Sequence, residues 1–215
     1  MVTQIIFTGI DALPTISLLG LAAGFVFTFR LISVLESVGA ASETINLLIN
    51  VIGLGIGPFL AAIILISRTG SAIVVDLGNM KLHGEIEGLE MLGININNYL
   101  IAPRLIGTAI SQLAITVYFT FIALVFGIVL SGLLVSNSHF DFLYEIGTAF
   151  TPYLVMIFVI KNLLFGIVIA ATSCYIGLHV KSSPTEVPQQ ATRAIVNSLI
   201  AIFIIEGLLA LAILQ

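Results

Sequence analysis

The chain has 215 residues, of which 59% are hydrophobic and 8% are charged, and its mean hydropathy is +1.21. A soluble domain carries roughly 25% charged residues, so this composition excludes an ordinary soluble protein. The formal net charge of −4 says little about nucleic acid, but the sequence has no Lys/Arg cluster that would bind phosphates. Cys174 is the single cysteine, which excludes a disulfide framework and a cysteine-based metal site.

Five apolar runs are long enough to cross a bilayer as helices, which requires about 20 residues each. The runs are continuous, whereas the strands of a membrane barrel alternate in polarity. We therefore predict an all-α integral membrane protein with about five transmembrane helices. No repeat of fixed period is visible, and we expect residues 1–215 to form a single domain. The five predicted spans cover residues 13–35, 45–67, 105–135, 149–178 and 194–214.

Glycines recur four residues apart in the first two runs, at Gly20 and Gly24 and at Gly53 and Gly57. Small residues at this spacing let membrane helices approach closely. We expect ordinary close helix packing at these positions.

The basic residues of the connections predict the orientation. Short connections that carry Lys and Arg stay on the cytoplasmic side. Only the connections 68–104 and 179–193 carry such residues, so both are expected in the cytoplasm, with the N-terminus inside and the C-terminus outside. The basic residues concerned are Arg68, Lys81, Arg104, Lys181 and Arg193.

The connection 68–104 contains an unusual acidic stretch, GEIEGLEMLGIN, at residues 84–95. At 100° per residue, Ile86, Leu89 and Leu92 fall on one stripe, and Glu87 and Glu90 fall on the opposite side. This pattern predicts a short amphipathic helix over residues 84–94. Met91 lies beside the acids, Glu85 lies within the apolar stripe, and Gly93 is a plausible helix stop.

Two interpretations of this helix stay open. In the first, it rests on the membrane surface and its acids only keep it solvated. In the second, it docks into a groove of basic and apolar residues on a cytosolic partner. The docking interpretation assigns the contact to Glu85, Ile86, Glu87, Leu89, Glu90 and Met91.

Four charged residues lie within or at the edge of apolar runs: Arg30, Asp76, Lys161 and Glu206. Insertion of a charge at the bilayer centre costs about 2.5–3.5 kcal/mol, so each charge needs a partner, water or a role. Arg30 and Glu206 lie at comparable depths, and Lys161 is the alternative partner of Glu206. A structural ion pair, a lipid-headgroup site and an ion relay are the competing interpretations. For Asp76 we expect a helix-end position or a pair with Arg68.

The sequence lacks the motifs of several enzyme classes. It contains no G-x-x-x-x-G-K-[ST] phosphate loop and no G-x-S-x-G elbow. His83, His139 and His179 are scattered along the chain without further ligands nearby. We therefore expect no metal site and no catalytic set.

The stretch RTGSAIVVDLGNMKLHGEIEGLEMLGI, residues 68–94, resembles the signature region of the MlaE-type (YrbE-like) ABC permeases. The family pattern reads roughly GRxGSAxxAELGxMxxxEEIDALExMGIDP. The resemblance continues through Tyr99–Arg104, Leu164–Gly166, Cys174–Gly177 and Ala191–Arg193.

The chain also departs from the family pattern. Leu54 and Gly55 stand where relatives usually carry an Arg-Glu pair, and the role of that pair here is open. Gly84 replaces the first acid of the EEI triplet, and Asn95-Ile96 replaces Asp-Pro. The N-terminal region is short for the family.

The resemblance implies the permease subunit of an ABC transporter that moves phospholipids or related lipids between membranes. The helix 84–94 would then be a coupling helix docked on a separate ATPase, which alone binds ATP and Mg²⁺. Further implied partners are a second copy of the chain and a periplasmic MCE-domain protein. The implied location is a bacterial inner membrane, with a plastid envelope as the alternative. Arg68 and Arg104 would reach lipid headgroups.

In the resembled family, the first and fifth spans line the lipid cavity near the external side. By this resemblance Phe25, Phe29, Arg30, Ile32 and Glu206 would line the lipid pathway here. Phe25, Phe29 and Ile32 share one helical face at i, i+4 and i+7. An aromatic stripe at this spacing is also typical of packing against another helix.

Two other functions compete with a permease subunit. An intramembrane lipid enzyme would need a nucleophile or acid–base set at a common depth, and none is evident. An ion-coupled secondary transporter would use Glu206 or Lys161, but it would not explain the acidic cytoplasmic helix.

Overall fold

The structure is a computed structural model that describes residues 13–38, 47–134, 151–180 and 183–213. The ends of the predicted spans at residues 45–46, 135, 149–150 and 214, and the loop residues His139 and Lys181, lie outside these ranges. The described residues form helices and contain no strand. Five of the helical stretches are long and apolar enough to cross a membrane, which confirms the predicted fold class. The orientation of the termini stays a prediction.

The first spanning helix is α2, Leu13–Val38, and the second runs without interruption through four segments. These are the π-helix η3, Ile49–Ile56, then α4, Gly57–Leu65, the π-helix η4, Ile66–Gly70, and α5, Ser71–Leu82. We expected the second span to end at residue 67 and a connection to follow. Instead the helix continues to Leu82, since Ile73, Val74 and Leu77 on α5 are buried against neighbouring helices.

The short helix α6, Glu85–Met91, precedes the third spanning stretch, which consists of the π-helix η5, Asn97–Ile101, and α7, Ala102–Leu134. The last two spanning helices are α9, Pro152–Leu178, and α10, Glu186–Ile213. The helix α10 begins eight residues before the predicted span at residue 194. Pro188 is compatible with this start because proline is tolerated in the first turn of a helix.

The chain divides into two compact units. The first unit includes Ala62–Gln112 and Leu163–Gln215, and the second includes Leu13–Ala61 and Leu113–Asn162. The single domain expected for residues 1–215 stays a prediction.

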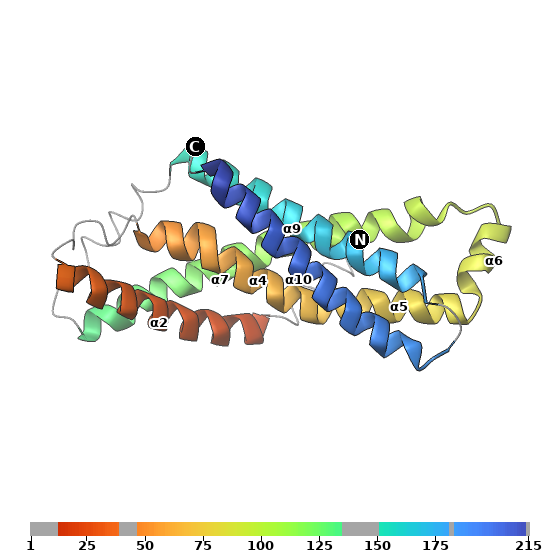
Figure 1. Cartoon of the computed structure of the whole chain (residues 1–215), viewed down its shortest axis with the longest axis horizontal. Helices are drawn as coiled ribbons and strands as arrows, with labels where there is room; N and C mark the ends of the chain where they lie inside the picture. Colours follow the sequence, from red (N-terminus) through yellow and green to blue (C-terminus); the bar gives the residue numbers. More distant parts are fainter. Residues whose placement is uncertain (1–12, 39–46, 135–150, 181–182, 214–215) are drawn as a thin grey trace. The chain divides into compact units, whose positions relative to one another are not determined.

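In the first unit, α10 packs along α5 and η4 (Figure 1). Its apolar core includes a cluster of Val74, Ile176, Ala191 and Ala194, contributed by α5, α9 and α10. The hydroxyls of Thr172 and Ser198 form a 2.5 Å hydrogen bond between α9 and α10. Apolar packing that includes the small residues Ala191 and Ala194, together with this hydrogen bond, holds the helices together.

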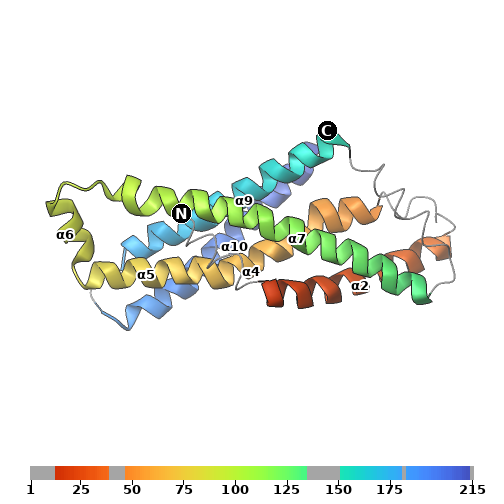
Figure 2. The ribbon, with the colours of Figure 1, turned by 180° about the vertical axis from the view of Figure 1, so that it is seen from behind.

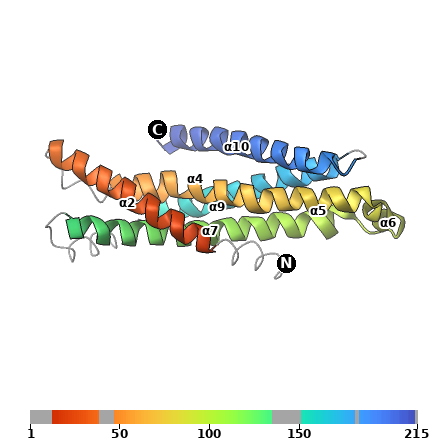
Figure 3. The same ribbon diagram turned by 90° about the horizontal axis from the view of Figure 1, so that it is seen from below.

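In the second unit, α2 lies along the C-terminal part of α7 (Figure 3). A Cβ added to Gly24 would lie 2.2 Å from the carbonyl oxygen of Ala123, so the two backbones are in direct contact there. The hydroxyls of Ser17 and Tyr118 are 2.8 Å apart across the same pair of helices. The close helix approach predicted at Gly24 is confirmed.

Candidate functional site at the turn between α5 and α7

The helix α6 starts at a glycine that also ends α5. Gly84 has a φ of +71°, in the left-handed region that favours glycine. Its N–H donates to the carbonyl of Lys81 at 3.1 Å, and its own carbonyl accepts from the N–H of Gly88 at 3.0 Å. One residue therefore closes the last turn of α5 and opens the first turn of α6, which makes the junction short.

The C-terminal end of α6 is closed by a Schellman motif. Gly93 has a φ of +76°, its N–H donates to the carbonyl of Glu90 at 2.9 Å, and the N–H of Ile94 donates to the carbonyl of Leu89 at 3.1 Å. This pair of bonds is the usual arrangement around a left-handed glycine at a helix end. The predicted stop at Gly93 is confirmed, and the predicted helix 84–94 is observed as Glu85–Met91.

The apolar side of α6 packs against residues of α5, η5 and α9, at the turn of the chain between α5 and α7 (Figure 2). Ile86 is buried, and Leu89 is half-buried against the same cluster. The buried members of this cluster are Ile73, Leu77, Ile86, Leu100 and Cys174. Of the six predicted docking residues, Ile86 therefore faces inward, and its side chain holds α6 in place.

Leu92 does not belong to this buried side. It was expected on the apolar stripe with Ile86 and Leu89, but its side chain is 76% exposed. The helix ends at Met91, and Leu92 has a ψ near 0°, so the 100° spacing no longer applies to it. The expectation for Leu92 is therefore wrong.

The outward side of α6 combines acids with apolar side chains. Glu85, Glu87 and Glu90 are exposed, Met91 is 88% exposed, and Leu92 adjoins it. Two large exposed apolar side chains next to three carboxylates form a small mixed surface, which we call the α6 surface. Docking of a partner on this surface stays a prediction.

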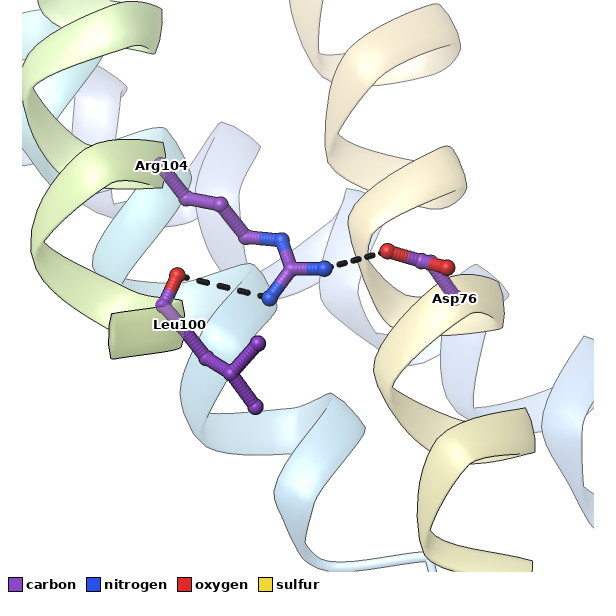
Figure 4. Close-up of polar contacts among 3 residues, drawn as sticks. All are labelled: Asp76, Leu100 and Arg104. Atoms are coloured by element: carbon purple, nitrogen blue, oxygen red, sulfur yellow. Dashed lines mark hydrogen bonds and ion pairs between the residues drawn. The ribbon is translucent and has the colours of Figure 1, made fainter. Parts of the chain in front are cut away.

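An ion pair joins α5 to α7, the two helices that flank α6. The guanidinium of Arg104 donates from Nη2 to Asp76 Oδ2 and from Nη1 to the carbonyl of Leu100 at 3.3 Å (Figure 4). The side chain of Arg104 is 10% exposed and that of Asp76 is 60% exposed. Arg104 was expected to reach lipid headgroups, and Asp76 was expected at a helix end or paired with Arg68; Asp76 instead lies inside α5. In the structure they pair with each other, because the turn through α6 brings α5 and α7 side by side.

Lys81 provides a further link at the same end of the first unit. Its ammonium donates to the carbonyl of Leu178, the last residue of α9. The last carbonyls of a helix have no partner within the helix, and a nearby lysine satisfies one of them. Together with the ion pair and the apolar cluster, this bond fixes α5, the helix from which α6 departs.

The residues predicted for a lipid pathway lie in different units. On α2, the rings of Phe25 and Phe29 stack with their centroids 5.9 Å apart, and Arg30 is exposed while Ile32 is half-buried. Glu206, on α10, is half-buried and belongs to the first unit. A shared cavity, and a pair of Arg30 or Lys161 with Glu206, stay predictions.

Lys161 is buried in α9, and its ammonium donates to the carbonyl of Leu54 in η3. This contact lies within the second unit and was not expected. No group of three or more His, Cys, Asp or Glu side chains that could hold a metal occurs among the described residues. The expectation of no metal site stays a prediction for the whole chain.

Comparison with known proteins gives a family match over almost the whole chain. The model of a family described as "Permease MlaE" matches residues 1–212. A "Probable ABC transporter permease protein" of Synechocystis sp. is 29% identical over 181 residues, which cover 84% of this chain and 69% of that protein.

Two further relatives carry more specific names. The chloroplastic protein TRIGALACTOSYLDIACYLGLYCEROL 1 of Arabidopsis thaliana is 25% identical over 203 residues, or 94% of this chain and 58% of that protein. The "Intermembrane phospholipid transport system permease protein MlaE" of Haemophilus influenzae is 29% identical over 119 residues, or 55% of this chain and 46% of that protein.

Proposed function

Because the chain belongs to the MlaE permease family, we propose that it is the membrane permease subunit of an ABC transporter that moves phospholipids or related lipids between membranes. The observation that carries the proposal is the family match over residues 1–212. The name of the Haemophilus influenzae relative, a phospholipid transport permease, supports the substrate class. The five helices of membrane-crossing length and composition among the described residues fit a multi-pass permease.

The α6 surface is the proposed docking site for a cytoplasmic ATPase. A docking helix needs an exposed contact surface, and the carboxylates of Glu87 and Glu90 with the side chains of Met91 and Leu92 supply both charge and apolar area. Such a helix suits a groove lined by basic and apolar residues. In this proposal the partner binds ATP and Mg²⁺, and this chain acts as the transport component.

The contacts that attach α6 to its flanking helices support a coupling role. A force on α6 can reach the spanning helices only if α6 does not swing freely on its connections. Ile86 in the apolar cluster and the two capped ends hold α6, and the Asp76–Arg104 pair ties its two flanking helices together. Displacement of α6 by the ATPase would therefore move α5 and α7 together, as in a rigid-body transition.

The remaining partners follow from the same family. We propose a homodimer, because five spans in one chain rarely enclose a path for a large amphiphile, and a two-fold pair supplies a central cavity. A periplasmic MCE-domain protein would continue the path, and the membrane would be a bacterial inner membrane. The chloroplastic relative supports a plastid envelope as the alternative location.

Charge reversal on the α6 surface tests this function. Glu87→Arg with Glu90→Arg is expected to lower co-purification of the ATPase at least tenfold while membrane insertion is retained. The matched control is Gln189→Arg with Thr192→Arg, which places two arginines on exposed positions at the start of α10. Wild-type ATPase recovery in the α6 variant would overturn the docking proposal.

A further inference from the structure

The second unit contains an apolar pocket between η3, α7 and α9. Its volume is about 420 Å³, within the range of roughly 300–1,000 Å³ that small-molecule sites occupy. None of the residues predicted for a lipid pathway lines it. Its wall includes Gly53, Leu54, Thr120, Phe121, Val155 and Phe158.

The wall of the pocket offers almost no polar contact. Thr120 is the lining residue with a hydroxyl, and that hydroxyl is buried and turned toward Gly57, where an added Cβ would lie 3.0 Å from Oγ1. Its methyl group faces Gly53, at 4.0 Å from an added Cβ. A bound water needs two to four polar partners, so the chemistry of the wall favours an apolar occupant.

The pocket lies between helices that are long and apolar enough to cross a membrane. All of its walls belong to the stretches Ile49–Leu82, Asn97–Gly127 and Pro152–Leu178, each of membrane-crossing length and composition. Phe121 and Val155 on its rim are exposed, so the pocket opens toward the surroundings of the helices. In a bilayer those surroundings are the acyl chains of lipids.

The shape of the rim favours a narrow chain over a docked helix. Helices that associate in membranes approach through small residues. The exposed rim residues are Val117, Phe121 and Val155, which are branched or aromatic, and the small residue Gly53 is buried. A helix backbone is thus held away from the pocket, whereas a flexible acyl chain can pass between these side chains.

Two features give the pocket a fixed wall. The segment η3 is a π-helix, a rare form that recurs at functional sites. On α9, Lys161 lies about one turn after Phe158. Its ammonium donates to the carbonyl of Leu54 in η3. This bond joins two walls of the pocket, η3 and α9.

We propose that this pocket binds one acyl chain of a phospholipid from the surrounding bilayer. The site goes beyond the proposed transport function, since it requires neither the ATPase nor a second copy of the chain. The bond from Lys161 to Leu54 in the pocket wall also gives the buried charge of Lys161 a structural role that does not involve ion transport.

A photoreactive lipid tests the proposal. The full chain is purified from membranes in mild detergent with a phosphatidylethanolamine that carries a diazirine within one acyl chain, and adducts are mapped by mass spectrometry after irradiation. Adducts are expected to concentrate in residues 117–125 and 154–159. Gly53→Leu, which extends a side chain into the pocket, is expected to lower this labelling at least tenfold. Gly207→Leu, at a position with no atom within 4 Å of an added Cβ, is the control.

A second variant keeps the test decisive if Gly53→Leu does not fold. Val155→Trp adds bulk at the exposed rim and is expected to lower labelling without repacking the interior. Labelling that stays at the wild-type level in the folded variants would overturn the proposal. Equal labelling of exposed α10 residues such as Phe203 and Leu208 would also overturn the proposal. A photoreactive amino acid at position 121 that crosslinks to a protein chain instead of a lipid would overturn it too.

Discussion

Replacing Gly93 by alanine tests how the end of α6 is held. Gly93 has a φ of +76°, and a Cβ added there would meet no atom within 4 Å. The substitution therefore introduces no clash, and its whole penalty is backbone strain of about 1–2 kcal/mol for a residue in the left-handed region. The bonds from Gly93 and Ile94 to α6 depend on this conformation, so the strain lowers the free energy needed to open α6 locally.

Gly88 supplies a matched control within the same helix. It lies in the interior of α6, and a Cβ added there would also meet no atom within 4 Å. Alanine is more favourable than glycine in a helix interior by roughly 0.8–1.0 kcal/mol. The same chemical change, Gly to Ala, is thus expected to destabilise α6 at position 93 and to stabilise it at position 88.

Hydrogen exchange followed by mass spectrometry measures the difference. A change of one to two kcal/mol shifts an opening equilibrium about 5–30-fold, so the hydrogen-bonded amides of residues 88–94 are expected to exchange faster by that factor in Gly93→Ala. In Gly88→Ala they are expected to exchange up to about fivefold more slowly. Residues 108–112 of α7 report on the rest of the first unit and should not change. Exchange in Gly93→Ala at or below the wild-type rate would refute the capping role.

Three further predictions test other parts of the molecule, two of them with a control variant. Asp76→Ala is expected to destabilise the protein by about 1–3 kcal/mol, because it leaves the buried guanidinium of Arg104 without its carboxylate. Arg104→Met should destabilise it less, since Asp76 is largely solvated. Equal shifts of the melting temperature in the two variants would contradict this difference. Gly24→Ala is expected to lower the free energy of unfolding by about 1–3 kcal/mol through overpacking against the Ala123 backbone. Gly207→Ala, in the interior of α10 with no atom within 4 Å of an added Cβ, should not lower it and can raise it by up to about 1 kcal/mol. A neutral Gly24→Ala would show that α2 and α7 do not touch. Glu206→Gln should leave transport ATP-dependent, and a lost dependence on an ion gradient would instead favour the secondary transporter.

The spans and α6 could be predicted from the sequence because both follow from local patterns. Runs of about 20 apolar residues identify membrane helices, and a left-handed glycine at position 93 ends α6 as expected. The extension of the second helix to Leu82 was missed, because Asp76, Asn79 and Lys81 resemble a polar loop. The signal for it was present in the helical spacing of Ile73, Val74 and Leu77.

The links between distant residues could not be predicted. Asp76 and Arg104 are 28 positions apart and meet only because α6 turns the chain back on itself. Lys161 and the carbonyl of Leu54 meet through tertiary packing. Every residue carries a backbone carbonyl, so the sequence does not show which one accepts this bond. The apolar pocket is equally invisible, since its lining residues have the same composition as residues that face lipid.

Co-purification from native membranes in mild detergent, with mass spectrometry of proteins and lipids together, tests the proposed transport function. We predict that the chain is recovered with a second copy of itself, with a subunit that carries a G-x-x-x-x-G-K-[ST] phosphate loop, and with bound phospholipid. The ATP-binding subunit should be lost from the Glu87→Arg, Glu90→Arg variant and kept in the Gln189→Arg, Thr192→Arg control. A chain that is recovered without an ATP-binding subunit, or whose subunit is unaffected by the α6 variant, would contradict coupling through α6.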